Sequence, residues 1–425
     1  MTAVVGILNK QAVAMAADSA VTIGNGNGRK ILNKANKVFT LSKYHPVGIM
    51  IYNAASFMGT PWETIIKVYR QQLGNKSFPT LEDYQKDFID FLRAKNFFTD
   101  GQTQKNYLGL FAAEIIQMVL GEILKKNPGL SPDDTGDLYN LLDVEFSGLL
   151  ARWKKPEAIC SEFSDYELAT FDSYATDILK QVRKEVLIDI GLKVPNALFK
   201  KMTQTIFYLL KSQEKLHSYT GLIFCGFGED EIYPRLIPLN ISMVLNDRLR
   251  YFVTEESAII SNDMNAAVRP FAQTDVIDTI LSGIDPSLDD YYLKHFDEML
   301  KKYNQAILGS IGTSDLLLSE KIKNLKTEPI VREFFRMNQR IKSQNYIQPL
   351  MSAVGTLSKE DLAEMAESLI YLTYLKRRIT FAEESVGGPV DVAIISKGDG
   401  FIWIKRKHYF KPELNQHFIS NYFNI

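Results

Sequence analysis

Residues 2–25 read TAVVGILNKQAVAMAADSAVTIGN, and this stretch decides the fold. Small and β-branched apolar residues fill 2–8 and 13–17, and the polar residues 9–11 separate the two runs. Short apolar runs joined by a polar segment predict two strands connected by a turn. If Met1 is removed, the first strand begins with Thr2, and a free amino-terminal threonine is a group that can do chemistry.

The rest of the chain alternates between strand-rich and helix-rich blocks. Strands are expected over 2–59, helices over 80–215, strands again from 219, helices over 272–380, and a closing hairpin at 390–407. This order predicts a layered α+β fold. The helical excess predicts two insertions into a core that is formed by three pieces of the chain. The boundaries are 1–96 (core), 97–215 (insertion), 216–284 (core), 285–356 (insertion) and 357–425 (core).

Composition excludes several classes of protein. The chain has 425 residues, 49 basic against 50 acidic, and a formal net charge of -1, so no global field favours nucleic acid or anionic lipid. The basic run Lys405-Arg406-Lys407 is interpreted as a solvated strand end. No window approaches 18 uncharged apolar residues, so we expect no membrane span. Only Cys160 and Cys225 are present, and few cysteines favour a reducing, cytoplasmic compartment.

Motifs for cofactors and metals do not fit. GNGNGRK at 24–30 matches neither the phosphate-binding P-loop nor the dinucleotide fingerprint, and its Asn-Gly pairs favour turns. The histidines lack metal-ligand spacing, and no G-x-S-x-G is present. We therefore expect no cofactor and no metal. The histidines are at positions 45, 217, 295, 408 and 417.

An amino-terminal threonine carries its own base. Its α-amino group has an ordinary pKa of about 7.7–8.0, well below that of a lysine side chain. A buried lysine nearby lowers neighbouring pKa values, and it needs a carboxylate partner because an unpaired buried charge is costly.

This chemistry coincides with a resemblance. TAVVGI at 2–7 and AVAMAADSAVTIGN at 12–25 resemble the opening of proteasome β-subunits and are similar to the peptidase subunit of the bacterial two-component ATP-dependent protease. The resemblance implies that Thr2 is the nucleophile and that Asp18 pairs with a catalytic lysine. Asn36-Lys37-Val38-Phe39 matches the context of that lysine, which makes Lys37 the candidate. Lys34, which preserves ungapped spacing, is the alternative.

The resemblance extends to the last eighth of the chain. EESVGG at 383–388, DVAII at 391–395 and GDG at 398–400 look like the family's ending. Glu383 then falls near the threonine amine. Val386 stands where the family has a serine that binds this amine, and Ser385 is one position off.

Two further positions complete the implied site. Asn53, in YNAASFMG, takes the place of the backbone oxyanion donor, and Asn keeps the required N–H. The family also has a serine in a glycine-rich loop near mid-chain. Ser261 is the serine found near that position here, and the surrounding glycines are missing. Ile51 and Ala55, on the strand expected to line the substrate pocket, favour apolar peptide side chains.

The resemblance implies the four-layer α-β-β-α sandwich of N-terminal nucleophile (Ntn) hydrolases, with inserted helical regions. It implies a threonine peptidase that acts on a peptide or protein as a homo-oligomer, and it allows an unfoldase partner. The segment 108–124, LGLFAAEIIQMVLGEIL, is apolar nearly all round, which predicts subunit contacts through the first insertion. The alternatives are an Ntn amidase acting on a small-molecule amide, and a non-catalytic assembly or sensor subunit.

Overall fold

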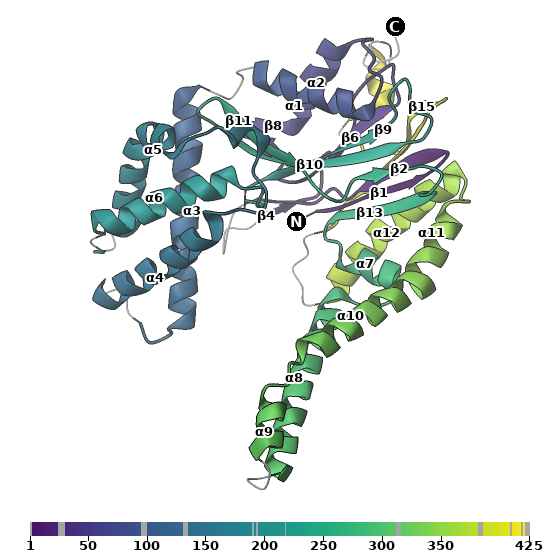
Figure 1. Ribbon diagram of the computed structural model, residues 1–425. Helices are drawn as coiled ribbons and strands as arrows, with labels where there is room; N and C mark the ends of the chain where they lie inside the picture. The colour runs from purple at the N-terminus through teal and green to yellow at the C-terminus, as the bar shows by residue number, and fades with distance from the viewer. Residues whose placement is uncertain are drawn as a thin grey trace. The chain divides into compact units, whose positions relative to one another are not determined.

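A computed structural model gives the structure of the chain. It describes residues 2–23, 30–94, 100–130, 135–188, 191–192, 194–216, 218–311, 316–380, 386–408, 410–417 and 420. These residues form two compact units (Figure 1). The first unit comprises Met1–Val38, Ile232–Arg235 and Ala258–Ile425, and the second comprises Phe39–Glu231 and Leu236–Ser257.

The first unit contains an antiparallel five-stranded sheet in the order β13-β1-β2-β14-β15. Its central strands are apolar and buried along their whole length. The turn between β1 and β2 is fixed by the Asn9 side chain, whose oxygen accepts from the backbone N–H of Gln11 at 2.9 Å and of Ala12 at 3.3 Å. The strands are β1 (Ala3–Asn9), β2 (Ala12–Ala17), β13 (Ala266–Ala272), β14 (Asp391–Ser396) and β15 (Gly400–Lys405).

Helix α12 (Lys359–Ile379) crosses one face of this sheet, together with α7 (Asp275–Ser282) and α11 (Gln348–Val354) (Figure 1). Ser358 caps α12, because its hydroxyl accepts from the Asp361 N–H while the Asp361 carboxylate accepts from the Ser358 N–H. Alternate residues of β1 (Ala3, Val5 and Ile7) pack against the apolar face of α12. This helix–sheet contact is the core of the first unit.

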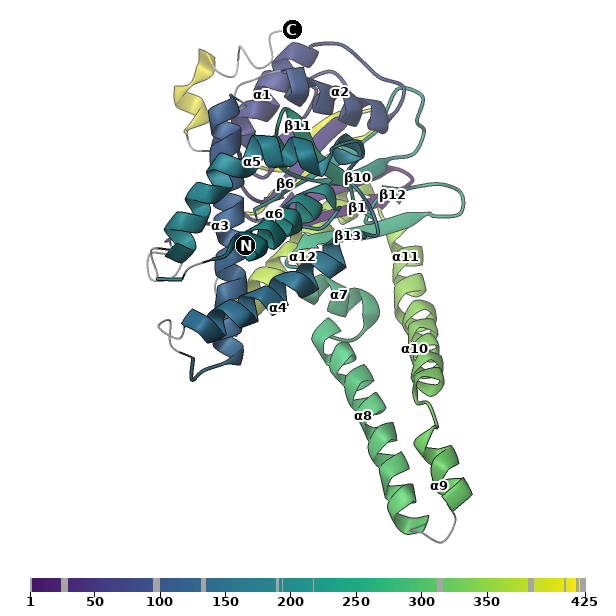
Figure 2. The ribbon, with the colours of Figure 1, turned by 60° about the vertical axis from the view of Figure 1, so that its left-hand side comes forward.

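An arm of helices α8, α9 and α10 projects from the same unit (Figure 2). Helix α8 (Pro286–Ile311) runs out, and α9 (Leu316–Lys323) and α10 (Glu328–Lys342) bring the chain back. The rings of Phe296 and Phe334 stack with their centroids 4.4 Å apart. Lys342 forms an ion pair with Asp289 across the two helices.

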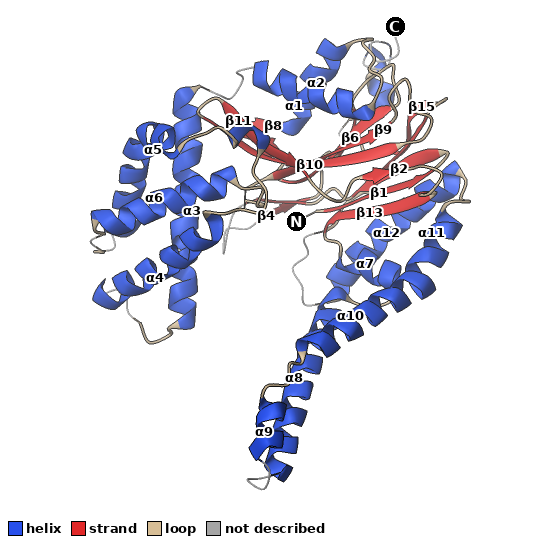
Figure 3. Cartoon of the chain, viewed as in Figure 1, coloured by secondary structure: helices blue, strands red, loops and turns tan. Residues whose placement is uncertain are grey.

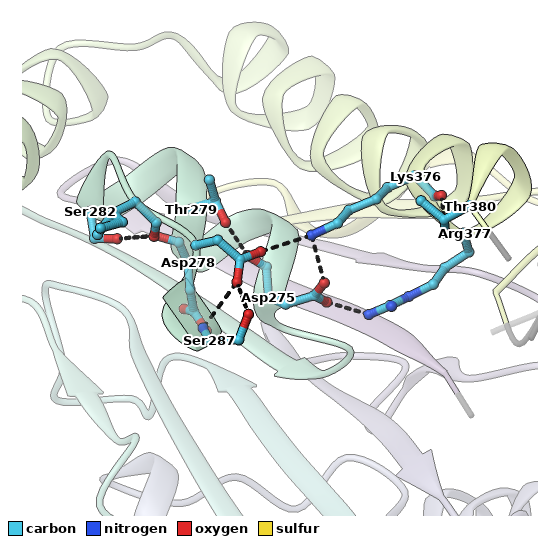
Figure 4. A network of polar contacts seen from close by, with 10 residues as sticks. Asp275, Asp278, Thr279, Ser282, Ser287, Lys376, Arg377 and Thr380 are labelled. Atoms are coloured by element: carbon cyan, nitrogen blue, oxygen red, sulfur yellow. Dashed lines mark hydrogen bonds and ion pairs between the residues drawn. The ribbon is translucent and has the colours of Figure 1, made fainter. Parts of the chain in front are cut away.

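The base of the arm is held by charges (Figure 4). Lys376 of α12 donates to Asp275 at 2.9 Å and to Asp285 at 3.1 Å, and Arg377 also bonds Asp275. Hydrogen bonds from Ser287, then the Lys376 ammonium, lower the pKa of the Asp285 carboxyl to about 2. Because Asp285 directly precedes α8, these bonds fix the start of the arm to α12.

The second unit has a sheet in the order β11-β10-β9-β6-β5 (Figure 3). Helices α1 (Trp62–Leu73) and α2 (Leu81–Ala94) belong to its core, where the Trp62, Tyr69, Phe88, Phe91 and Phe224 rings pack together. The strands are β5 (Val38–Thr40), β6 (Val47–Asn53), β9 (Thr220–Gly226), β10 (Arg235–Leu245) and β11 (Arg248–Val253). A short ribbon is formed by β7 (Ser56–Phe57) with β8 (Thr60–Pro61). The first unit contains a second short ribbon, of β3 (Val21–Ile23) with β4 (Lys30–Leu32), and the two-residue strand β12 (Ala258–Ile259).

Four helices follow in the second unit: α3 (Gly101–Lys126), α4 (Thr135–Trp153), α5 (Leu168–Arg183) and α6 (Asn196–Lys211). Within the described ranges, α3 alone is long and apolar enough to cross a membrane by length and composition. Glu114 and Glu122 lie within this helix, so the sequence still contains no 18-residue window that is both apolar and uncharged. Phe111, Ile115 and Ile123 of α3 are buried in the core of the second unit.

Buried Arg250 of β11 closes the end of α6. Its guanidinium donates to the carbonyl oxygens of Leu210 at 2.7 Å, Ser212 at 2.6 Å and Glu214 at 2.8 Å. Burial lowers the pKa of Arg250 to about 10. One side chain thus satisfies carbonyls that the helix end leaves without an internal partner.

The α+β class is confirmed, as are the strands at 3–9 and 12–17 and the closing hairpin. Strand β13, which pairs with β1, was not expected from the sequence. The four-layer sandwich and the five boundaries of core and insertions stay predictions, and the two compact units divide the chain at other places.

Arg250 gives a test of the second unit. Arg250→Met should lower the free energy of unfolding by about 3 kcal/mol, because several buried carbonyls lose their donor. Arg152→Met, at an exposed arginine 3.9 Å from Glu214, should cost less than about 1 kcal/mol. Urea unfolding followed by circular dichroism measures both, and equal costs would contradict the role given to Arg250.

Candidate active site

The carboxylate of Asp18 is the centre of the site. Asp18 directly follows β2, and its own N–H donates to the carbonyl of Ala3 at 3.1 Å. Its Oδ1 accepts from the Ala3 N–H at 3.0 Å and from Lys37 Nζ at 2.6 Å. Its Oδ2 accepts from the N–H groups of Ala20 and Gly387, both at 3.0 Å. Each oxygen of the carboxylate thus accepts two hydrogen bonds.

Lys37 lies on an irregular segment directly before β5, and only 3% of it is exposed. Its Nζ donates to Asp18 and, at 2.6 Å, to the carbonyl of Ala20. Burial lowers the pKa of the Lys37 ammonium below its ordinary value, while the Asp18 carboxylate opposes this shift. Lys34, the alternative, is exposed. The structure therefore pairs Lys37 with Asp18.

Thr2 is next to this pair, because it precedes Ala3, whose N–H is bound to Asp18. Thr2 is 2% exposed, and its carbonyl accepts from the Gln273 N–H at 3.2 Å. Pairing of β1 with both β13 and β2 fixes this end of the strand. One oxygen of Asp18 thus connects the residue after Thr2 with a buried ammonium. Met1 lies outside the described residues.

A second buried ion pair lies close enough to act on the charge of Lys37. Asp391, at the start of β14 and opposite Ala17, accepts from both the backbone N–H and the Nζ of Lys407. Lys407 lowers the pKa of Lys37, and Asp391 raises it, both less than burial and Asp18 do. The interpretation of Lys407 as part of a solvated strand end is wrong, since its side chain is largely buried. In the sequence, the signal for this second pair was Asp391 itself, an acidic residue at the start of an apolar strand.

The segment that follows α12 in the chain contacts Asp18 and Ser19 through its backbone. Gly387 donates to Asp18, and its carbonyl accepts from the Ser19 N–H at 3.0 Å. Gly388 has φ of 76°, and a Cβ there would lie 2.9 Å from Asn33 atoms. Only glycine fits this left-handed position without strain. Val386 is buried in the apolar core of the first unit, so its side chain does not replace a serine hydroxyl. Glu383 and Ser385 lie outside the described residues.

The remaining expected residues have other surroundings. Asn53 ends β6 in the second unit with φ of 68°, and its Nδ2 donates to the Tyr219 carbonyl at 2.8 Å. The Ser261 hydroxyl accepts from the N–H groups of Asp263 and Met264, both at 3.2 Å, which makes it a turn residue. Ile51 is buried in the apolar core of the second unit, so the prediction that it lines a pocket is wrong.

No metal site accompanies the ion pairs. Within the described part of the chain, no group of three or more His, Cys, Asp or Glu side chains is placed to hold a metal ion. The glycine-rich stretch 24–29 lies outside the described residues.

Comparisons with known proteins give weak likenesses. No family model and no curated protein matches the chain. Among solved structures, a mutant of Anbu from Hyphomicrobium sp. strain MC1 is similar at 10% identity and a TM-score of 0.25, over 99% of this chain and 94% of that one. The helical assembly of the Anbu complex from Pseudomonas aeruginosa is similar at 8% identity and a TM-score of 0.30, over 99% and 93%.

These findings correct the assignment made from the sequence. The chain was identified as a member of the proteasome β-subunit-like Ntn hydrolases with large helical insertions. No family model supports that assignment, and the matching solved structures are Anbu proteins at very low TM-scores. The resemblance rested on short motifs around Thr2, Asp18, Lys37 and residues 383–400, and short motifs do not by themselves establish a family. The site must therefore be judged by its geometry.

The buried pair should show strong coupling in a double-mutant cycle. Asp18→Asn and Lys37→Met should each lower the free energy of unfolding by about 3 to 5 kcal/mol, because each leaves the other charge buried and unpaired. The double variant should cost less than the sum of the two. Lys34→Met, at an exposed lysine, is the matched control and should cost less than about 0.5 kcal/mol. Additive costs for Asp18→Asn and Lys37→Met would contradict the pairing.

Proposed function

We propose that this chain is a threonine-type hydrolase that cleaves peptide bonds, with Thr2 as its nucleophile after removal of Met1. The observation that carries the proposal is the bridge made by Asp18 Oδ1 between the N–H of Ala3 and the ammonium of Lys37. This bridge holds a buried positive charge beside the residue that would become the amino terminus.

The chemistry follows from that charge. The free α-amino group of Thr2 would act as the base that removes the proton of its own hydroxyl, directly or through a water. The Lys37 ammonium lowers the pKa of both groups, which keeps the amine unprotonated and favours the attacking alkoxide. The alkoxide attacks the carbonyl carbon, an ester forms as the amine leaves, and water releases the acid.

Two residues complete the proposed mechanism. The backbone N–H of Asn53 would stabilise the oxyanion, and Glu383 would lie near the amine of Thr2. Asp18 acts through Lys37 and Ala3, so it is a positioning residue.

The substrate would be a peptide or a protein, and the enzyme would work as a homo-oligomer in the cytoplasm. Both cysteines are free and buried in the structure, and such thiols persist in a reducing compartment. An unfoldase partner would supply unfolded chains if the substrate is a folded protein. Apolar residues of α3 such as Leu110 and Met118 are exposed, and this supports the proposed contacts through residues 97–215.

The first test concerns the nucleophile. Thr2→Ala should lower kcat for short peptide substrates by about 10³-fold or more, because no other hydroxyl carries its own amine. Its thermal midpoint should stay within about 2 °C of the wild type, since one hydroxyl is lost. Mass spectrometry of the untreated protein should find Thr2 as the first residue. A protein from its native source that retains Met1 and still hydrolyses peptides would exclude Thr2 as the nucleophile.

The second test is the pH dependence of kcat/KM. The value should rise at a pH below about 8, because the α-amine must lose its proton and the nearby Lys37 ammonium lowers the pKa of that amine. It should fall again when Lys37 becomes neutral, and this alkaline limb should lie below the ordinary lysine value of 10.5 because burial lowers the pKa of Lys37. Thermal midpoints measured at each pH separate this loss from unfolding. An alkaline limb at or above 10.5 in folded protein would contradict the role of Lys37.

A further inference from the structure

Lys407 binds the carboxylate of Asp391 with both its backbone and its side chain. Its N–H donates to Oδ1 of Asp391 at 2.9 Å, and its Nζ bonds Oδ2. The side chain of Asp391 is 3% exposed and that of Lys407 is 11% exposed. Replacing a buried ion pair by apolar side chains is often neutral or favourable for stability. Stability alone therefore does not account for these two charges.

This pair is next to the pair of Asp18 and Lys37. Asp391 begins β14 and lies opposite Ala17, the last residue of β2, and Asp18 follows Ala17 directly. Opposite residues of antiparallel strands have their Cα atoms about 4.5–5.5 Å apart. The two buried carboxylates thus come from neighbouring strands, at positions that differ by one residue.

A β-bulge brings Lys407 toward this place. Ala393 of β14 is opposite Trp403 of β15, but Val392 is opposite Lys405, so Ile404 is an extra residue in β15. In a regular ladder Asp391 would be opposite Lys405, whereas the bulge moves Lys407 one position nearer to Asp391. Bulges commonly redirect side chains next to functional sites. The local backbone is therefore built to deliver this lysine to that carboxylate.

The charges around Lys37 show what the second pair does. They come from three elements: Asp18 at the end of β2, Asp391 at the start of β14, and Lys407 after β15. A carboxylate near an ammonium favours its charged form, and a second ammonium disfavours it. Since Lys407 occupies both oxygens of Asp391, Lys37 keeps its ion pair with Asp18 and the charge of Asp391 is offset. Lys407 lowers the pKa of Lys37, and this effect is larger than the opposing effect of Asp391.

We propose that Lys407 is a positioning residue that sets the charge state of Lys37: by binding both oxygens of Asp391, it leaves Asp18 as the carboxylate that pairs with Lys37. The consequence for catalysis rests on the proposed function, because the positive charge of Lys37 acts on Thr2 there. The control of Lys37 itself does not require activity.

The titration of Lys37 in the full-length protein tests this role directly. Protein labelled with ¹³C at lysine Cε reports the midpoint by NMR, and Lys37→Arg identifies the signal. Lys407→Met should raise the midpoint by at least about 0.5 pH unit, because the charge of Asp391 then lacks its counter-charge. The double variant Asp391→Asn with Lys407→Met should reverse about half of this shift or more, since both charges are gone.

Two further variants separate charge from packing. Lys407→Arg retains the charge and should keep the midpoint within about 0.3 pH unit of the wild type. Lys405→Met, at a lysine that pairs with Glu367 at 2.6 Å, is the matched control and should behave likewise. Thermal midpoints show which variants are folded. Looser packing would admit water and raise the Lys37 midpoint in the double variant as far as in Lys407→Met. That result would overturn the proposal, as would a folded Lys407→Met without an upward shift or a Lys407→Arg shifted like Lys407→Met.

The pH profile of kcat/KM connects this role to the proposed hydrolase. In Lys407→Met both limbs should move to higher pH, because the uncompensated Asp391 charge also favours the protonated α-amine of Thr2. A protein without peptidase activity whose Lys37 titrates as described would contradict the proposed function and support the control of Lys37 by Lys407. An active enzyme whose Lys37 midpoint does not respond to Lys407→Met would overturn this inference alone.

Discussion

The buried ion pair between Asp18 and Lys37 is the constraint on which the first unit depends. Moving two charges out of water costs several kcal/mol for each ion, and attraction alone offsets this only when the remaining hydrogen bonds are made. Here they are made: three backbone N–H groups reach Asp18, and the Ala20 carbonyl reaches Lys37. The backbone around the pair therefore follows a path that places these hydrogen-bond donors and this acceptor beside the two charges.

Three distant parts of the chain meet at that pair. The first strand brings the Ala3 N–H, the irregular segment before β5 brings Lys37, and the segment after α12 brings the Gly387 N–H. The place of Thr2 follows from this convergence, together with the pairing of β1 between β13 and β2. Thr2 directly precedes β1, a central strand of the sheet, and only 2% of this residue is exposed.

Helix α12 connects the site and the arm through one rigid element. Its apolar face packs on β1, while Lys376 and Arg377 in its last turn hold Asp275 and Asp285 at the base of the arm. The placement of basic side chains at the end of a helix is favourable, because the carbonyls there carry partial negative charge. The same turn thus stabilises the helix and sets the direction in which α8 leaves the unit.

The sequence by itself determined local elements of the first unit. Alternation of apolar runs and turns was enough to predict β1, β2 and the β14–β15 hairpin, because these depend on neighbours in the chain. The pairing of Asp18 with a lysine was implied only by the resemblance of the motifs around Thr2, Asp18 and Lys37, and that resemblance left Lys34 open. Only the tertiary structure decided between the two lysines, paired β13 with β1, and buried Lys407 against Asp391. Each of these three outcomes depends on which distant segment of the chain packs nearby. The charge or polarity of a side chain does not determine which residues will surround it in the folded protein. The same reason explains the errors at Ile51 and in the family assignment, since apolar patterns specify burial and not the partner that produces it.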